Sequence, residues 1–84
     1  MYDYKKERPG IFTEPGVETL IKIRENARAL TEQAGAAQMG AIIRGVCGDT
    51  WLMLACVDYM VEKGELKEIQ FGPCTGQNRI FVKP

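Results

Sequence analysis

The side chains best suited to contact a charged ligand are cationic, amide or hydroxyl groups in separate parts of the chain. They are Lys5, Lys6, Arg8, Arg44, Thr50, Thr75, Gln77, Asn78 and Arg79. Arg and Lys bind phosphate oxygens, whereas Arg, Asn and Gln also hydrogen-bond to base edges. Because residues 77–79 are consecutive and follow a glycine, they are expected at a turn that could touch a phosphate, a groove edge or a protein.

The same turn has a simpler interpretation within the fold. Gln77 and Asn78 could satisfy backbone groups of their own turn, and Arg79 could pair with an acid across a hairpin. A basic segment near the start of a small protein often serves only to keep the surface solvated. The sequence leaves both interpretations open.

A second set of residues suits a protein surface better than a polyanion. They are Trp51, Leu54, Ala55, Asp58 and Tyr59. The spacing of the last four is expected to place an apolar and acidic face on the outside of a helix, and Trp and Tyr are frequent interface hot spots. Trp51 is expected to pack in the core, with an interface role as the alternative. Tyr59 falls just off the buried stripe, so it is expected to be exposed.

Side chains for catalysis and metal binding are scarce. The chain has no His and no Ser, and no glycine-rich phosphate loop, so the usual general bases and hydroxyl nucleophiles are not expected. Cys47, Cys56 and Cys74 form no CxxC pair and are too few for a zinc site. Cys56 is expected to be buried, and the other two to lie in turns. We predict no catalytic residue, metal or cofactor; thiol-based sensing is a further alternative.

Length and charge narrow the range of functions. A chain of 84 residues suits a single domain, and its 11 Lys and Arg residues balance its 11 Asp and Glu residues. No overall positive field therefore draws it toward nucleic acid. The longest uncharged apolar run, residues 51–57, is far too short to cross a membrane, and no signal peptide is evident. We expect a cytoplasmic protein without a membrane partner.

The order of elements follows from capping residues and periodicity. Residues 1–12 are predicted to form a polar arm outside the core, and residues 13–84 the folded domain. Thr13 is a suitable N-cap for a helix predicted from about Glu14 to Gln33, which Gly35 terminates. The buried stripe of this helix is expected on Leu20, Ile23, Ala27, Leu30 and Ala34.

Two further helices are predicted after a short extended link at residues 36–38. The first covers residues 39–46, and the second starts with Asp49 or Thr50 as alternative N-caps and ends at Gly64. The core stripe of this last helix is expected on Met53, Cys56, Val57 and Met60.

Beyond Gly64 the pattern becomes that of a β-hairpin. A strand is predicted around residues 66–71, a turn over residues 72–76, and a closing strand over residues 79–83. Alternation predicts that Ile80 and Val82 face inward, with Arg79, Phe81 and Lys83 on the other face.

Two stretches of this region resemble winged helix-turn-helix domains. VEKGELKEI at residues 61–69 resembles the end of a recognition helix and the first wing strand. GQNRIFV at residues 76–82 is similar to the returning wing strand of small bacterial and phage members. The resemblance covers roughly residues 17–83. It implies three helices and a β-hairpin wing, with the third helix entering the DNA major groove and the wing reaching phosphate or the minor groove.

The sequence departs from a typical DNA reader on the third helix. On the resemblance, the start of that helix and the turn at residues 75–79 would contact DNA. The positions of the helix expected to face outward carry no Lys or Arg but include Asp49, Asp58 and Glu62, which would repel the phosphate backbone.

We therefore predict an α+β winged helix that acts as a non-enzymatic binding module. One hypothesis is a nucleic-acid-binding, transcription-regulator-like protein that contacts duplex DNA through its wing and basic arm. The alternative is a protein-interaction or homodimerisation module that uses the apolar and acidic face of the third helix.

Overall fold

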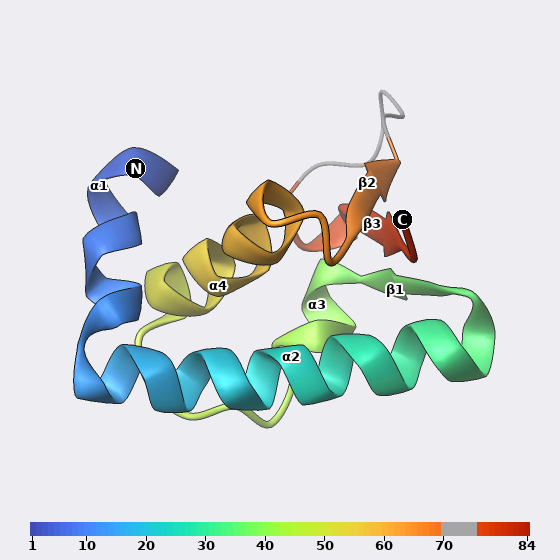
Figure 1. Cartoon of the computed structure of the whole chain (residues 1–84), viewed down its shortest axis with the longest axis horizontal. Coiled ribbons are helices and arrows are strands. Elements are labelled where there is room, and N and C mark those ends of the chain that lie inside the picture. The colour runs from blue at the N-terminus through green and yellow to red at the C-terminus, as the bar shows by residue number, and fades with distance from the viewer. Residues whose placement is uncertain (70–75) are drawn as a thin grey trace.

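The computed structural model describes residues 1–69 and 76–84. In this part of the chain, four α-helices and two 3-10 turns accompany one small antiparallel sheet (Figure 1). The elements are α1 (Tyr4–Glu7), η1 (Arg8–Phe12), α2 (Glu14–Ala34), β1 (Ala36–Gln38), α3 (Met39–Ile42), α4 (Thr50–Glu62), β2 (Lys67–Ile69), η2 (Gly76–Asn78) and β3 (Ile80–Val82). The α+β class is confirmed.

The long helix α2 forms as its capping residues predict. The Thr13 side chain accepts a hydrogen bond from the Gly16 backbone N–H at 3.2 Å, and Gly35 closes the helix with a left-handed φ of 78°. Of the expected stripe, Leu20, Ile23 and Ala27 are buried, Leu30 is half-buried and Ala34 is exposed.

Helix α4 also matches its prediction, and the structure decides its cap. The Asp49 carboxylate accepts a hydrogen bond from the Trp51 N–H at 2.9 Å, so Asp49 and not Thr50 is the N-cap. All four residues of the predicted stripe are buried. Ala55 was expected on the outer face, but it is fully buried. Asp58 and Glu62, three and seven residues further along the same side of the helix, bind the N-terminal segment.

The N-terminal segment is folded, and the prediction that it lies outside the core is wrong. Its helical turns α1 and η1 pack on α4, and η1 also packs on the first part of α2. Ile11 is fully buried in the core. The backbone of Gly10 and Ile11 approaches Gly16 so closely that a Cβ atom there would clash with both residues. Glycine at the start of α2 therefore allows the segment to dock.

The sheet has three strands in the order β1–β3–β2, and both pairings are antiparallel. The expected link at residues 36–38 is thus a strand, whose Ala37 pairs with Phe81. Phe81 is fully buried, whereas Ile80 and Val82 are only half-buried. The predicted inward face of β3 is therefore wrong: consecutive Ile, Phe and Val are all apolar, so alternation alone could not decide the buried face.

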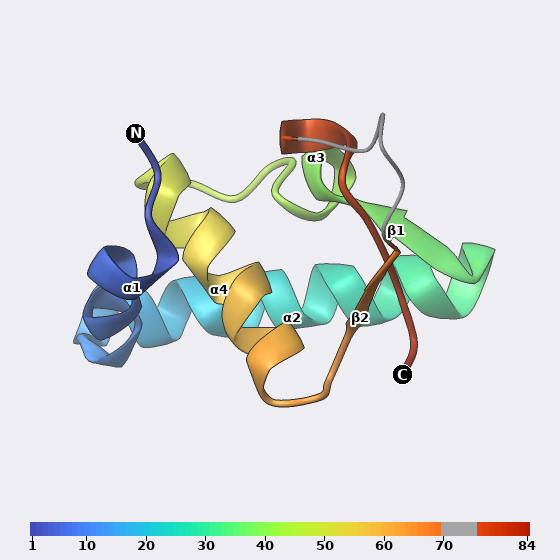
Figure 2. The same cartoon turned by 90° about the horizontal axis from the view of Figure 1, so that it is seen from above.

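The helices surround a single core. Figure 1 shows α2 along the lower edge, with α1, α4 and the sheet all above it. Seen from above, α4 crosses α2, and α1 and the sheet lie toward opposite ends of α2 (Figure 2). Helix α4 thus packs against both α2 and the N-terminal segment. Among the helices described, none combines the length and apolarity needed to span a membrane.

Candidate functional site

The candidate site is the α4 outer face, which we define by Trp51, Leu54 and Asp58. These residues recur at three- and four-residue steps, so they lie on one side of the helix. Trp51 is 42% exposed, while the other two are half-buried. The expectation that Trp51 packs in the core is wrong, and its interface role stays a prediction.

Arg79 connects this face to the sheet through two carboxylates. Its Nε and Nη2 donate hydrogen bonds to the two Glu68 oxygens, each at 2.8 Å, and Nη2 also donates to Asp58 Oδ1 at 2.7 Å. The three side chains are only 17–20% exposed. Hydrogen bonding to the guanidinium lowers the pKa of Glu68, and the same carboxylate raises the pKa of Arg79. The guanidinium also lies 5.2 Å from the centre of the Phe81 ring.

The N-terminal segment hydrogen-bonds to two carboxylates of α4. The Tyr2 hydroxyl donates to Asp58 Oδ2, and the Tyr4 hydroxyl donates to Glu62 Oε1, both at 2.6 Å. Burial and, second, the bond to Asp58 raise the pKa of Tyr2. Burial and then the bond to Glu62 raise the pKa of Tyr4 to about 12. Both phenols therefore remain neutral donors at physiological pH.

Glu62 also holds Arg8 in a two-point ion pair. Arg8 Nε donates to Glu62 Oε1 at 2.9 Å, and Nη2 donates to Oε2 at 2.7 Å. Hydrogen bonds from Arg8 and then Tyr4 lower the pKa of Glu62 to about 2. The Arg8 guanidinium also stacks near Phe12 and Tyr59, whose rings meet edge to face at 5.6 Å between centroids. Tyr59, which was expected to be exposed, is consequently half-buried.

The structure does not gather the predicted cationic residues on one surface. Arg79 pairs with Glu68 across the hairpin, as the alternative interpretation predicted, and Arg8 pairs with Glu62. Lys5 and Lys6 are exposed on α1. Arg44 is exposed just after α3, and α1 and α3 lie well apart in both views (Figures 1 and 2).

The other predicted polar residues are exposed wherever the structure describes them. Gln77 and Asn78 are exposed in η2, and the Asn78 side-chain oxygen accepts a hydrogen bond from the Gln38 side chain at 3.1 Å. Asn78 is therefore bonded to a side chain of strand β1. Thr50 is exposed at the first residue of α4. Thr75 lies outside the described residues.

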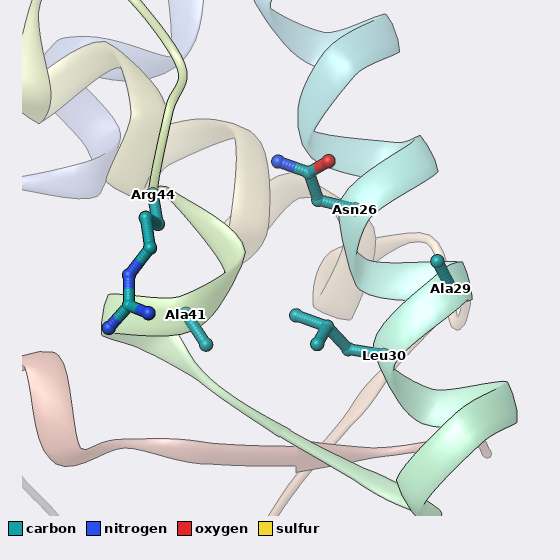
Figure 3. Close-up of a pocket in the computed structure, with 5 residues that line it drawn as sticks. All are labelled: Asn26, Ala29, Leu30, Ala41 and Arg44. Atoms are coloured by element: carbon teal, nitrogen blue, oxygen red, sulfur yellow. The ribbon is translucent and has the colours of Figure 1, made fainter.

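A shallow depression of about 300 Å³ lies between α2 and α3. Figure 3 shows its lining residues, which are Asn26, Ala29, Leu30, Ala41 and Arg44. The Asn26 amide donates to the Ile42 carbonyl at 2.9 Å, which ties α2 to α3. The hollow is open and mostly apolar, with one cation at its edge.

Two of the three cysteines lie in the described part of the chain. Cys47 is exposed between α3 and α4, and Cys56 is buried as predicted. Burial raises the pKa of the Cys56 thiol to about 11, which keeps it protonated and unreactive. Cys74 lies outside the described residues. Within residues 1–69 and 76–84, no three His, Cys, Asp or Glu side chains are grouped to hold a metal ion.

Sequence reasoning missed four residues of this arrangement: Tyr2, Tyr4, Gly16 and Glu68. One signal was available, because Asp58 and Glu62 are four residues apart and must share one side of α4. Acids on a helix face that packs against another segment require donors, and the two Tyr residues without an assigned role were Tyr2 and Tyr4. The pairing of Glu68 with Arg79 could be inferred only from the position of Glu68 across the hairpin.

Comparisons of the chain with models of known protein families, with curated proteins and with solved structures find no match. Its function is therefore to be inferred from the contacts described above.

Proposed function

We propose that this protein is a non-enzymatic winged-helix module that binds a protein partner through the α4 outer face. The order of helix, short strand, two helices and two strands from residue 14 onward supports the winged-helix assignment. In this assignment α3 and α4 form the helix-turn-helix, and the segment from β2 to β3 forms the wing.

The observation that carries the choice of partner is the position of Arg79. A winged helix that contacts DNA needs free cations at the third helix and the wing. Here Arg79, the cation of the predicted wing turn, lies between Asp58 and Glu68, so its charge is already neutralised within the fold. A duplex would have to displace two carboxylates to reach it, at the cost of leaving half-buried charges unpaired.

The exposed part of the α4 outer face has the chemistry of a protein interface. Trp51 presents a large aromatic surface to solvent, and the half-buried Leu54 lies about one helical turn further along. Asp49, at the start of the same helix, contributes a negative charge. We therefore expect the partner to present an apolar side chain flanked by Lys or Arg.

A displayed library of random peptides tests this proposal, because selection from it requires no named partner. Selection on the wild-type protein should enrich peptides with an apolar anchor and adjacent basic residues, and these should bind Trp51→Ala at least about tenfold more weakly. Trp51 is the only tryptophan, so its fluorescence should shift to shorter wavelength as an enriched peptide is titrated in. Peptides that bind wild type and Trp51→Ala equally would refute the site.

A matched control separates loss of contact from loss of folding. Ile21→Ala removes an exposed apolar side chain of α2 and should leave peptide binding unchanged. A mixed-sequence DNA duplex provides the competing measurement, at low and high salt. We expect only weak binding that Arg79→Ala does not reduce. Salt-dependent binding that requires Arg79 would instead favour nucleic acid as the ligand.

A further inference from the structure

Helix α2 has a second exposed apolar surface, which is separate from the α4 outer face. Val17 and Ile21 are four residues apart, so they lie on the same side of the helix. They are 45% and 49% exposed, although the opposite side of α2 packs into the core. In Figure 1 the other helices and the sheet lie on the upper side of α2. A β-branched pair on a helix flank is a suitable element for pairing with another helix.

Two charges on this flank are placed symmetrically about Ile21. Glu14 lies seven residues before Ile21, and Arg28 lies seven residues after it. Seven residues correspond to about two helical turns, so both charges share the side of Ile21. Arg28 is available for a new contact because its side chain is 64% exposed and its bond to Glu65 is long, at 3.4 Å.

We propose that α2 pairs with α2 of a second copy of this chain, antiparallel and about a twofold axis at Ile21. In such a pair, Ile21 of one copy meets Ile21 of the other, because an isologous interface brings a residue on the axis against itself. The same operation places Glu14 of each copy opposite Arg28 of the other. A parallel pairing would instead bring Glu14 against Glu14 and Arg28 against Arg28, which is repulsive.

The apolar seam is short, so the dimer is expected to be weak. Only two apolar side chains from each copy contribute to it, which is at the low end of specific interfaces. We expect the dimer to have a dissociation constant between about 10 µM and about 1 mM. Sedimentation of the intact chain over this range should show a mass rising from 9.4 kDa toward twice that value.

The first test places a charge on the axis. Ile21→Lys should abolish the concentration-dependent rise in mass, since two ammonium groups would then face each other. Gln33→Lys is the matched control, because it adds the same charge at an exposed position on a different flank of α2. It should leave dimerisation unchanged. A wild-type chain that stays monomeric up to about 1 mM would overturn the proposal.

The second test uses charge reversal, which separates pairing between copies from effects within one copy. Glu14→Lys and Arg28→Glu should each weaken the dimer by about tenfold, and the double variant should recover most of the loss. Thermal unfolding of each variant at low concentration shows whether the monomer remains folded. Failure of the double variant to recover dimerisation, with folded monomers, would refute the antiparallel arrangement.

The third test detects proximity on the axis directly. In a Cys47→Ser, Cys74→Ser background, Ile21→Cys should form an intermolecular disulfide under mild oxidation, because the two thiols would meet across the twofold axis. Gln33→Cys in the same background should crosslink much more slowly. Equal rates would contradict the proposal. Trp51→Ala should dimerise like wild type. The α2 surface can therefore be tested independently of the proposed partner site on α4.

Discussion

Two neighbouring contacts hold helix α4, one from the N-terminal segment and one from the sheet, with the same chemistry and different burial. On the N-terminal side, Arg8 pairs with Glu62, and the two side chains are 37% and 34% exposed. On the sheet side, Arg79 pairs with Asp58 and Glu68, all at 20% exposure or less. Solvent screens the first pair, whereas removing one partner of the second leaves charge in a poorly hydrated place. Burial, and not the number of ion pairs, should therefore decide how much each contributes.

The two sides also differ in what accompanies the charges. The N-terminal side brings Ile11 into the core, so apolar burial and not its ion pair should anchor that segment. The sheet side relies on the half-buried Arg79 itself. Both sides use cations that a DNA-binding protein would leave free, which links the stability of this fold to its proposed preference for a protein partner.

The largest effect is expected from Ile11→Ala. Truncating this fully buried side chain should lower the free energy of unfolding by about 2–5 kcal/mol, as measured by chemical denaturation. The adjacent Phe12→Ala is the control, because Phe12 is 55% exposed and contributes mainly an aromatic contact, so its loss should cost at most about 1.5 kcal/mol. Equal losses for the two variants would show that the segment is not anchored through Ile11.

Arg79→Met should have the next largest effect, about 2–4 kcal/mol, because it leaves Asp58 and Glu68 without their cation. Lys67→Met removes a neighbouring exposed cation and should change stability by less than about 0.5 kcal/mol. Adding Glu68→Gln to Arg79→Met should recover part of the loss. Urea denaturation of wild type and the three variants measures these differences. If Arg79→Met is as stable as wild type, the cluster contributes only to the specificity of the fold.

Gly16→Ala should destabilise the protein by about 1–3 kcal/mol, the usual cost of overpacking. This sign is the reverse of the general rule, since Ala in a helix is usually favoured over Gly by about 0.5–1 kcal/mol. The new Cβ would lie 2.7 Å from backbone atoms of Ile11, so α2 and η1 would have to separate. Glu18→Ala, at an exposed position on the same helix, is the control. A stabilising Gly16→Ala would mean that the N-terminal segment undocks without cost.

The smallest effect is expected from removing the exposed ion pair between Arg8 and Glu62. This effect should depend on pH. Glu62 has a pKa of about 2 in the folded protein against an ordinary 4.5. Its contribution is therefore fully present above about pH 4.5 and is lost as the pH falls toward 2. Glu62→Gln should slightly lower the melting temperature at pH 7, and the difference from wild type should disappear near pH 2. A difference that stays constant with pH would exclude this ion pair as its cause.

Several features of the fold could be predicted from the sequence because their causes are local. Capping by Thr13 and Asp49, and termination at Gly35, depend on groups within four residues of each helix end. The buried stripe of α4 follows from its periodicity. These signals also located the helices of the candidate site, but they did not assign Trp51 to the surface.

Only the tertiary structure decided which partners the charged and apolar side chains acquire. Arg79 could have faced solvent, DNA or an acid. The hairpin pattern predicts β3 beside β2, but only the fold brings Asp58 of α4 to Arg79. Residues 80–82 are all apolar, so the face of β3 was set by packing against the core. The docking of residues 1–12 likewise depends on contacts with residues about fifty positions away. Local sequence determines where helices start and stop; long-range packing determines which of their faces remain free to bind.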